Sequence, residues 1–187
     1  KGFKVTYLPV NSEGIIEASD LEKTIKPETI LVSIMYANNE IGTIQPISDI
    51  GKLLHKINQT REKEGLPKIL FHTDACQAAG FLDLNVKKLG VDLLSLNASK
   101  IYGPKGIGLL FIKEGIKIEP QILGGGQESG LRSGTENVPG IVGLAKALEM
   151  AQKNRLKESV RLKKLRDYLI SEIKKRIPKV VLNGHPE

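Results

Sequence analysis

Three short apolar runs, each followed at once by polar side chains, constrain the fold of this chain more than any other feature. The runs cover residues 30–36, 69–73 and 91–96, and they are short and β-branched or aliphatic enough to be buried strands. Segments with helical spacing lie between them, and the longest begins at Pro46. The alternation of strand and helix predicts an α/β fold with a mainly parallel sheet and helices on both faces.

The polar residues that follow the three runs are expected to meet at one edge of this sheet, where the carboxyl ends of parallel strands lie. An acid, Asp74, follows the second run, and a lysine, Lys100, follows the third. This layout suits pyridoxal phosphate, because an acid can keep the pyridine nitrogen protonated and a lysine can carry the aldehyde carbon as a Schiff base. The alternative is that Lys100 is a surface lysine before a turn.

Weaker signals predict the remaining elements near the amino terminus. Residues 1–7 alternate between apolar and polar side chains, which indicates a strand. Ser19 and Glu22 fit a capping box that would open a short helix ending before Pro27.

Two further elements are expected in the second half of the chain. A glycine-proline turn leads into residues 107–113 and is too short for a crossover helix, so this strand is expected to run antiparallel. A long basic helix should begin at Asn137 and bend or break near Asn154.

Four segments, 37–46, 72–80, 99–108 and 124–137, carry a resemblance to a known family. They include Ala-Asn-Asn-Glu-Ile-Gly-Thr-Ile-Gln-Pro, His-Thr-Asp-Ala-Cys-Gln-Ala-Ala-Gly, Ser-Lys-Ile-Tyr-Gly-Pro-Lys-Gly-Ile-Gly, Gly-Gly-Gly-Gln-Glu and Leu-Arg-Ser-Gly-Thr-Glu-Asn. In this order they resemble the cysteine desulfurases of the class V aminotransferase group. The resemblance extends over essentially the whole chain.

The resemblance implies part of a fold-type I pyridoxal phosphate enzyme. Residues 1–136 would belong to the large, cofactor-binding domain, and residues 137–187 would lead into the small domain. Such an enzyme converts L-cysteine to L-alanine and passes the sulfur, as a persulfide on an enzyme cysteine, to acceptors such as an iron-sulfur scaffold or the tRNA thiolation machinery. A cytoplasmic homodimer is expected.

Site residues follow from the same resemblance. Lys100 would be the catalytic lysine, Asp74 the partner of the pyridine nitrogen, and Gln77 a donor to the phenolic oxygen of the cofactor. Asn39 would face the ring or the substrate carboxylate.

The phosphate group is expected to contact three further residues. Asn97 and Ser99 keep hydrogen-bonding capacity where the family usually has serine and histidine, so Ser99 departs from the pattern. Thr135 would reach the phosphate in the neighbouring subunit of a homodimer.

The single cysteine, Cys76, matches a position beside the cofactor acid and is expected to be a buried small residue rather than the sulfur acceptor. The persulfide-forming cysteine of the family lies further along the polypeptide. We therefore expect this chain to be an internal fragment that is inactive alone. The cysteine and histidines show no metal-ligand spacing.

The net charge of +7 raises the alternative of a non-catalytic basic protein that binds nucleic acid. The excess positive charge falls between residues 146 and 179, on a segment with helical apolar spacing and no interleaved aromatic pattern for base stacking. A solvated helix face is the simpler interpretation, so no nucleic-acid partner is expected. No apolar run approaches the roughly 20 residues that span a bilayer, so no membrane partner is expected either. A selenocysteine lyase or another class V enzyme stays a further alternative.

Overall fold

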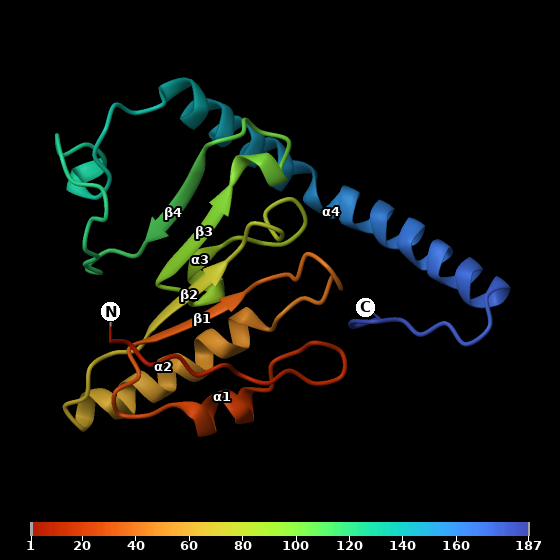
Figure 1. Ribbon diagram of the computed structural model, residues 1–187, viewed down its shortest axis with the longest axis horizontal. Coiled ribbons are helices and arrows are strands. Elements are labelled where there is room, and N and C mark those ends of the chain that lie inside the picture. The colour runs from red at the N-terminus through yellow and green to blue at the C-terminus, as the bar shows by residue number, and fades with distance from the viewer. Residues whose placement is uncertain (1, 187) are drawn as a thin grey trace.

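A computed structural model describes residues 2–186 and shows a four-stranded mixed sheet (Figure 1). Its strands are β1 (Leu31–Met35), β2 (Leu70–Asp74), β3 (Leu93–Asn97) and β4 (Gly108–Ile112). They lie in the order β1-β2-β3-β4, with β1, β2 and β3 parallel and β4 antiparallel to β3. The three predicted parallel strands and the antiparallel fourth strand are confirmed.

Four α-helices accompany the sheet within the described residues. They are α1 (Ala18–Thr24), α2 (Ile47–Lys63), α3 (Val86–Leu89) and α4 (Val138–Arg176). Two short 3₁₀ turns, η1 (Ala98–Lys100) and η2 (Glu128–Gly130), follow β3 and precede α4. The segments containing α2 and α3 connect β1 to β2 and β2 to β3, as parallel strands require.

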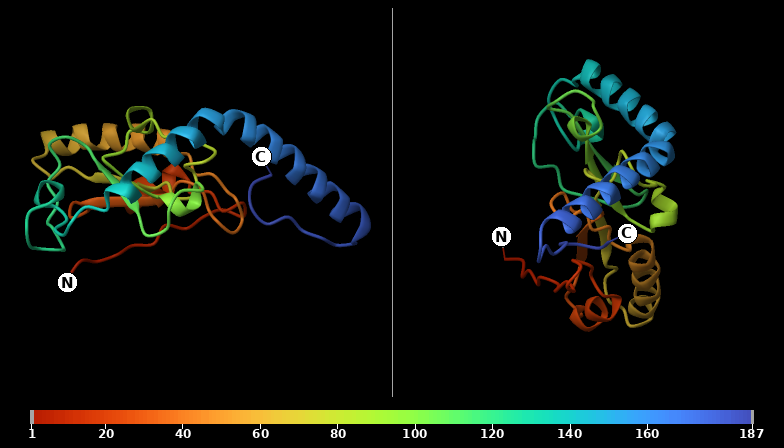
Figure 2. Two further views of the ribbon diagram at one scale, coloured as in Figure 1. Left: turned by 90° about the horizontal axis from the view of Figure 1, so that it is seen from above. Right: turned by 90° about the vertical axis from the view of Figure 1, so that its right-hand side faces the viewer.

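The core lies on one face of the sheet. Alternate side chains of the parallel strands point into it and are buried: Val32, Ile34, Phe71, Thr73, Leu94 and Leu96. All of them except Thr73 form one cluster with apolar residues of α1, α2, α3 and α4. The right-hand view of Figure 2 shows α2 and α4 on the same side of the strands. The opposite side chains of β2 and β3 are only half-buried, so this second face stays accessible in the described part of the chain. Helices were predicted on both faces, but the described helices pack with the core on the first face only.

Two predictions near the amino terminus are wrong. Lys1 lies outside the described residues, and residues 2–10 form no strand because no described strand pairs with their backbone. The first helix begins one residue before Ser19, and the residue that precedes it, Glu17, makes no side-chain cap, so the capping box does not form.

Helix α4 is continuous through Asn154, although the left-hand view of Figure 2 shows its axis changing direction. The Asn154 side chain donates a hydrogen bond to the carbonyl of Met150 (2.9 Å), an interaction that competes with the regular helix ladder. The first half of the helix packs on the body, where the Gln152 amide donates to the carbonyls of Ala79 (2.8 Å) and Leu82 (3.0 Å). The second half projects away from the sheet as an arm (Figure 1). The predicted helix is therefore bent but not broken.

The segment after α4 returns to the body and meets the loop that follows β1. The backbone N–H of His185 donates to Thr43 Oγ1 (3.2 Å), and the Thr43 hydroxyl donates to the Glu13 carbonyl (2.6 Å). Gly184 has a φ of +93°, and a Cβ there would lie 2.5 Å from the Ile41 carbonyl oxygen, so only glycine fits. Three distant segments are thus joined at the buried Thr43.

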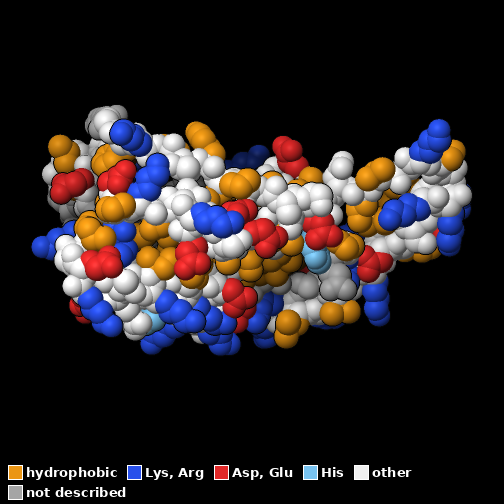
Figure 3. Space-filling view, turned by 90° about the horizontal axis from the view of Figure 1, so that it is seen from below, with side chains coloured by type: hydrophobic (Ala, Val, Ile, Leu, Met, Phe, Trp, Pro, Cys, Tyr) orange, Lys and Arg blue, Asp and Glu red, His pale blue; other side chains and the backbone are white. Residues whose placement is uncertain are grey.

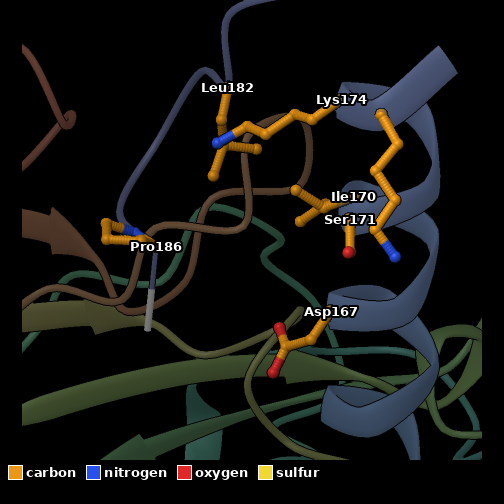
Figure 4. A pocket seen from close by; sticks show the side chains of 7 residues that line it. Asp167, Ile170, Ser171, Lys174, Leu182 and Pro186 are labelled. Atoms are coloured by element: carbon orange, nitrogen blue, oxygen red, sulfur yellow. The ribbon is translucent and has the colours of Figure 1, made fainter.

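A cavity lies between the arm and this returning segment (Figure 4). Its lining includes Asp167, Ile170, Ser171 and Lys174 from α4, and Leu182 and Pro186 from the returning segment. No residue that the sequence predicts for the cofactor site lines it.

The basic residues of α4 are partly paired along the helix itself. Lys146 contacts Glu149 (2.9 Å), Lys175 contacts Glu172 (2.9 Å), and Arg161 contacts Glu158. Figure 3 shows basic and acidic side chains interspersed over the side of the molecule that is seen from below. No helix in the described part of the chain is both long and apolar enough to cross a membrane.

Candidate active site

Asp74 ends the central parallel strand β2, on the accessible face of the sheet. In the strand register it lies between Met35 of β1 and Ser95 of β3. Its Oδ1 accepts a hydrogen bond from the backbone N–H of Cys76 (2.9 Å). A half-buried carboxylate at the carboxyl edge of a sheet has capacity left for another hydrogen-bond donor.

Lys100 ends η1, directly after the neighbouring strand β3. The Asn97 side chain caps this turn, because its Oδ1 accepts from the backbone N–H of Lys100 (3.2 Å) and from the hydroxyl of Ser99 (3.0 Å). Lys100 is exposed, and no carboxylate of the described residues forms an ion pair with it. The polar residues after β3 therefore fix the backbone of the lysine while leaving its amine without an acidic partner.

The pKa of Cys76 is influenced by charged residues at both strand ends. Burial raises the pKa of its thiol to about 11, and a hydrogen bond to Asp74 and the charge of that carboxylate add to the effect. A backbone hydrogen bond at Asn97 and the charge of Lys100 act in the opposite direction. Asp74 and Lys100 are thus both near enough to influence one thiol. The raised pKa also makes Cys76 a weak nucleophile at neutral pH.

The structure places the other predicted site residues in three separate segments. Gln77 is half-buried in the turn after β2, and Asn39 is exposed in the loop after β1 that an isolated bridge between Ala37 and Ile44 closes. Both loops leave the carboxyl ends of parallel strands, as predicted. Thr135 is exposed in the segment between η2 and α4.

A groove borders Lys100 on the side of α4. Its lining includes Phe81, Tyr102, Met150 and Asn154, and most of it is apolar. Asp74 does not line this groove, so the groove and the predicted cofactor site share the lysine but not the acid.

Sequence reasoning missed a row of polar side chains next to Asp74. His72 Nδ1 and Ser33 Oγ are hydrogen-bonded (2.8 Å), and His72 Nε2 and Ser95 Oγ are hydrogen-bonded (3.2 Å). Burial lowers the pKa of His72, and the charge of Asp74 partly offsets this. The alternation of the strand placed His72 on the face of Asp74, but the two serines could be found only from the register of the three strands.

These residues fit pyridoxal phosphate. The carboxylate of Asp74 accepts hydrogen bonds only from Cys76 among the described residues, so it can also accept one from a protonated pyridine nitrogen. The amine of Lys100 has no acidic partner there and can bond to the cofactor aldehyde.

Known proteins are similar to this chain over most of its length. The chain is 54% identical over 184 residues to the cysteine desulfurase IscS of Clostridium botulinum. This alignment covers 98% of this chain and 44% of that protein. It is 46% identical over 189 residues to the cysteine desulfurase of Pongo abelii, covering 100% of this chain and 39% of that protein. The chain therefore spans less than half the length of these relatives.

Solved structures share the fold. The chain superposes on a NifS-like protein with a TM-score of 0.85 and 46% identity, covering 93% of this chain and 46% of that one. It superposes on DndA from Streptomyces lividans with a TM-score of 0.78 and 32% identity, covering 92% and 47%. These matches confirm the predicted fold class. The family model for aminotransferase class-V matches residues 1–187, so this chain belongs to that family.

Proposed function

We propose that this chain forms the central part of a pyridoxal phosphate-dependent cysteine desulfurase. The observation that carries the proposal is the arrangement at one sheet edge, where Asp74 ends β2 and Lys100 follows the adjacent parallel strand β3. Among the described residues, Asp74 accepts a hydrogen bond only from Cys76 and Lys100 has no acidic partner, and both influence the pKa of the Cys76 thiol. The names of the related proteins support L-cysteine as the substrate.

Each residue has a task that follows from its position. Pyridoxal phosphate, when bound, supplies an aldehyde that condenses with amines and a ring that accepts electrons. Lys100 would hold the cofactor through its Nζ, and the same amine can carry a proton to or from the substrate carbon. Asp74 holds the proton on the pyridine nitrogen, and Gln77 and Asn39 bind the polar groups of cofactor and substrate. Asn97 and Ser99 orient the lysine and bind phosphate.

Sulfur transfer requires a cysteine that this chain does not supply. Cys76 is held in its thiol form, because burial and the neighbouring carboxylate raise its pKa to about 11. The persulfide therefore forms on a cysteine in another part of the complete protein, and a sulfur-acceptor protein such as an iron-sulfur scaffold receives it.

The domain division, the homodimer and the cytoplasmic location belong to the same proposal. Residues 1–136 form part of the cofactor-binding domain, and residues 137–187 lead into the small domain. The exposed position of Thr135 supports a role at the phosphate of a neighbouring subunit rather than in its own.

The test is chemical trapping in the complete protein that contains this chain. Incubation with pyridoxal phosphate, reduction with borohydride and peptide mapping should place a pyridoxyl group on Lys100, and Lys100→Ala should abolish it. Addition of L-cysteine should yield alanine. A labelled site elsewhere, or salt-sensitive nucleic-acid binding with no label, would contradict the proposal. Competition between cysteine and selenocysteine separates a desulfurase from a selenocysteine lyase.

A further inference from the structure

The strands that carry Asp74 and Lys100 are held together by a short ladder. The described residues give three register pairs between β2 and β3, but five between β1 and β2 and five between β3 and β4. A cofactor that bonds to both Asp74 and Lys100 needs these two strand ends at a constant spacing, and misplacement by about 1 Å can cost a hundredfold in rate. Additional contacts between β2 and β3 near the carboxyl edge therefore matter for the site.

Ser95 supplies such contacts on both sides of Asp74. Its backbone carbonyl accepts a hydrogen bond from the N–H of Ala75 (2.8 Å), the residue after Asp74. Its side-chain hydroxyl is hydrogen-bonded to Nε2 of His72 (3.2 Å), two residues before Asp74. Ser95 is itself the register partner of Asp74. Ser95 of β3 thus contacts residues both before and after Asp74 of β2.

His72 is suited to this link because both ring nitrogens are engaged. Nδ1 is hydrogen-bonded to Ser33 Oγ of β1 (2.8 Å) while Nε2 is hydrogen-bonded to Ser95 of β3, so the ring cannot turn without losing a bond. A hydroxyl can donate or accept, which lets both neutral tautomers of the ring satisfy both serines. Burial lowers the pKa of His72, which favours the neutral ring and leaves the negative charge of Asp74 for another partner.

We propose that His72 is a positioning residue, which, through Ser95, fixes the strand of Asp74 against the strand of Lys100. This inference rests on the proposed function, because it concerns the cofactor that those two residues would hold. His72 itself does not touch the cofactor in this proposal. The bond from His72 to Ser33 orients the ring, whereas the bond to Ser95 sets the spacing of the site.

The two serines provide a matched pair of variants for the test. Ser95→Ala removes the bond between β2 and β3, and Ser33→Ala removes an equivalent bond between β1 and β2, where the ladder is longer. His72→Leu removes both bonds and keeps an apolar side chain, while His72→Gln retains a group that can reach Ser95. Each variant is made in the complete protein, and melting curves without cofactor show whether it folds.

The measured quantities are the dissociation constant for pyridoxal phosphate and the visible circular dichroism of the bound cofactor, which reports its orientation. Ser95→Ala and His72→Leu should weaken binding about fivefold to tenfold, the size expected for one or two hydrogen bonds. Both should change the circular dichroism. His72→Gln should restore much of the loss, and Ser33→Ala should stay within about twofold of the wild type.

Two results would overturn the inference. Unchanged binding and circular dichroism in folded Ser95→Ala show that the bond does not position the site, even when His72→Leu fails to fold. Equal losses in Ser33→Ala and Ser95→Ala show a general effect on the sheet. A wild-type protein that binds pyridoxal phosphate and is labelled at Lys100 keeps the proposed function intact in either case, whereas a wild-type protein that does neither overturns both.

Discussion

Charged residues at the two ends of the sheet differ in how many bonding partners they have. At the amino edge, Asp92 is 4% exposed; its Oδ1 contacts Lys68 (2.7 Å) and Lys113 (3.6 Å), and its Oδ2 accepts from the backbone N–H of Phe71 (3.1 Å). At the carboxyl edge, the described residues offer Asp74 only Cys76, and Lys100 has no acidic partner.

Arg61 extends the same contrast at the amino edge. It is 4% exposed, and its guanidinium donates to the carbonyls of Lys26, Pro27, Thr29 and Pro67. These hydrogen bonds connect the end of α2 to the segments that lead into β1 and β2. The amino edge therefore stabilises the fold with fully bonded charges, whereas the carboxyl edge keeps bonding capacity for a ligand.

The largest effect should come from Asp74→Asn in the complete protein. In the proposed function, loss of the carboxylate removes the charge that would hold the pyridine proton, so alanine formation from cysteine should fall on the order of a hundredfold to a thousandfold. The free energy of unfolding should change little. Asp92→Asn is the matched control, since it alters an equivalent acid at the other edge. Equal activity losses per folded molecule in the two variants would remove the functional distinction between the edges.

Arg61→Met should cause the largest loss of stability. The variant removes the donors of four partly buried hydrogen bonds made by a side chain that is itself buried, so the free energy of unfolding should fall by about 3 kcal/mol. Urea denaturation followed by far-ultraviolet circular dichroism measures it. Lys63→Met, an exposed position at the same end of α2, serves as the control and should change stability by less than about 0.5 kcal/mol. A similar small effect at Arg61 would show that its contacts do not support the fold.

Asp92→Asn should destabilise the protein less than Arg61→Met. The amide can keep an acceptor for the Phe71 N–H, and Lys68 and Lys113 are partly exposed, so about 1–2 kcal/mol should be lost. The same denaturation experiment applies, with the exposed Asp49→Asn as the control. A more stable variant would indicate that burial of this carboxylate costs more than its contacts return.

The smallest effect concerns the reactivity of Cys76. Because its pKa is raised to about 11, the thiol stays protonated at neutral pH, and alkylation by iodoacetamide should be slower than for the unfolded chain. The rate should continue to rise with pH until about pH 11, whereas the unfolded chain should level off near its ordinary value of 9.0. Asp74→Asn should move the midpoint downward, although burial, the larger cause, is retained. A midpoint that does not respond to Asp74 would contradict the proximity of these two groups.

Much of the fold was predictable because short apolar runs and helical spacing are local properties. The strands that carry Asp74 and Lys100, the antiparallel direction of β4 and the start of α4 after Asn137 all follow from residues close in sequence. The strand at residues 2–7 was mispredicted because alternation shows that a segment can pair but not whether a partner lies beside it.

The site was less predictable where it depends on contacts between distant segments. Away from the site, Arg61 has the pattern of a surface charge near a helix end, and its burial depends on the carbonyls of Lys26 and Pro27, which lie 35 and 34 positions away in sequence. Ser33 and Ser95 become partners of His72 only through the register of three strands. A single sequence shows which residues can donate and accept, but the partners are determined by the packed sheet.

The junction at Thr43 links the far end of the polypeptide to the neighbourhood of Asn39. His185 and Thr43 are 142 positions apart, yet one hydrogen bond joins them, and the Asn39 loop is closed only a few residues away. A ligand that moves the Asn39 loop would therefore also displace the segment that follows α4. Conversely, a movement of that segment would displace the Asn39 loop.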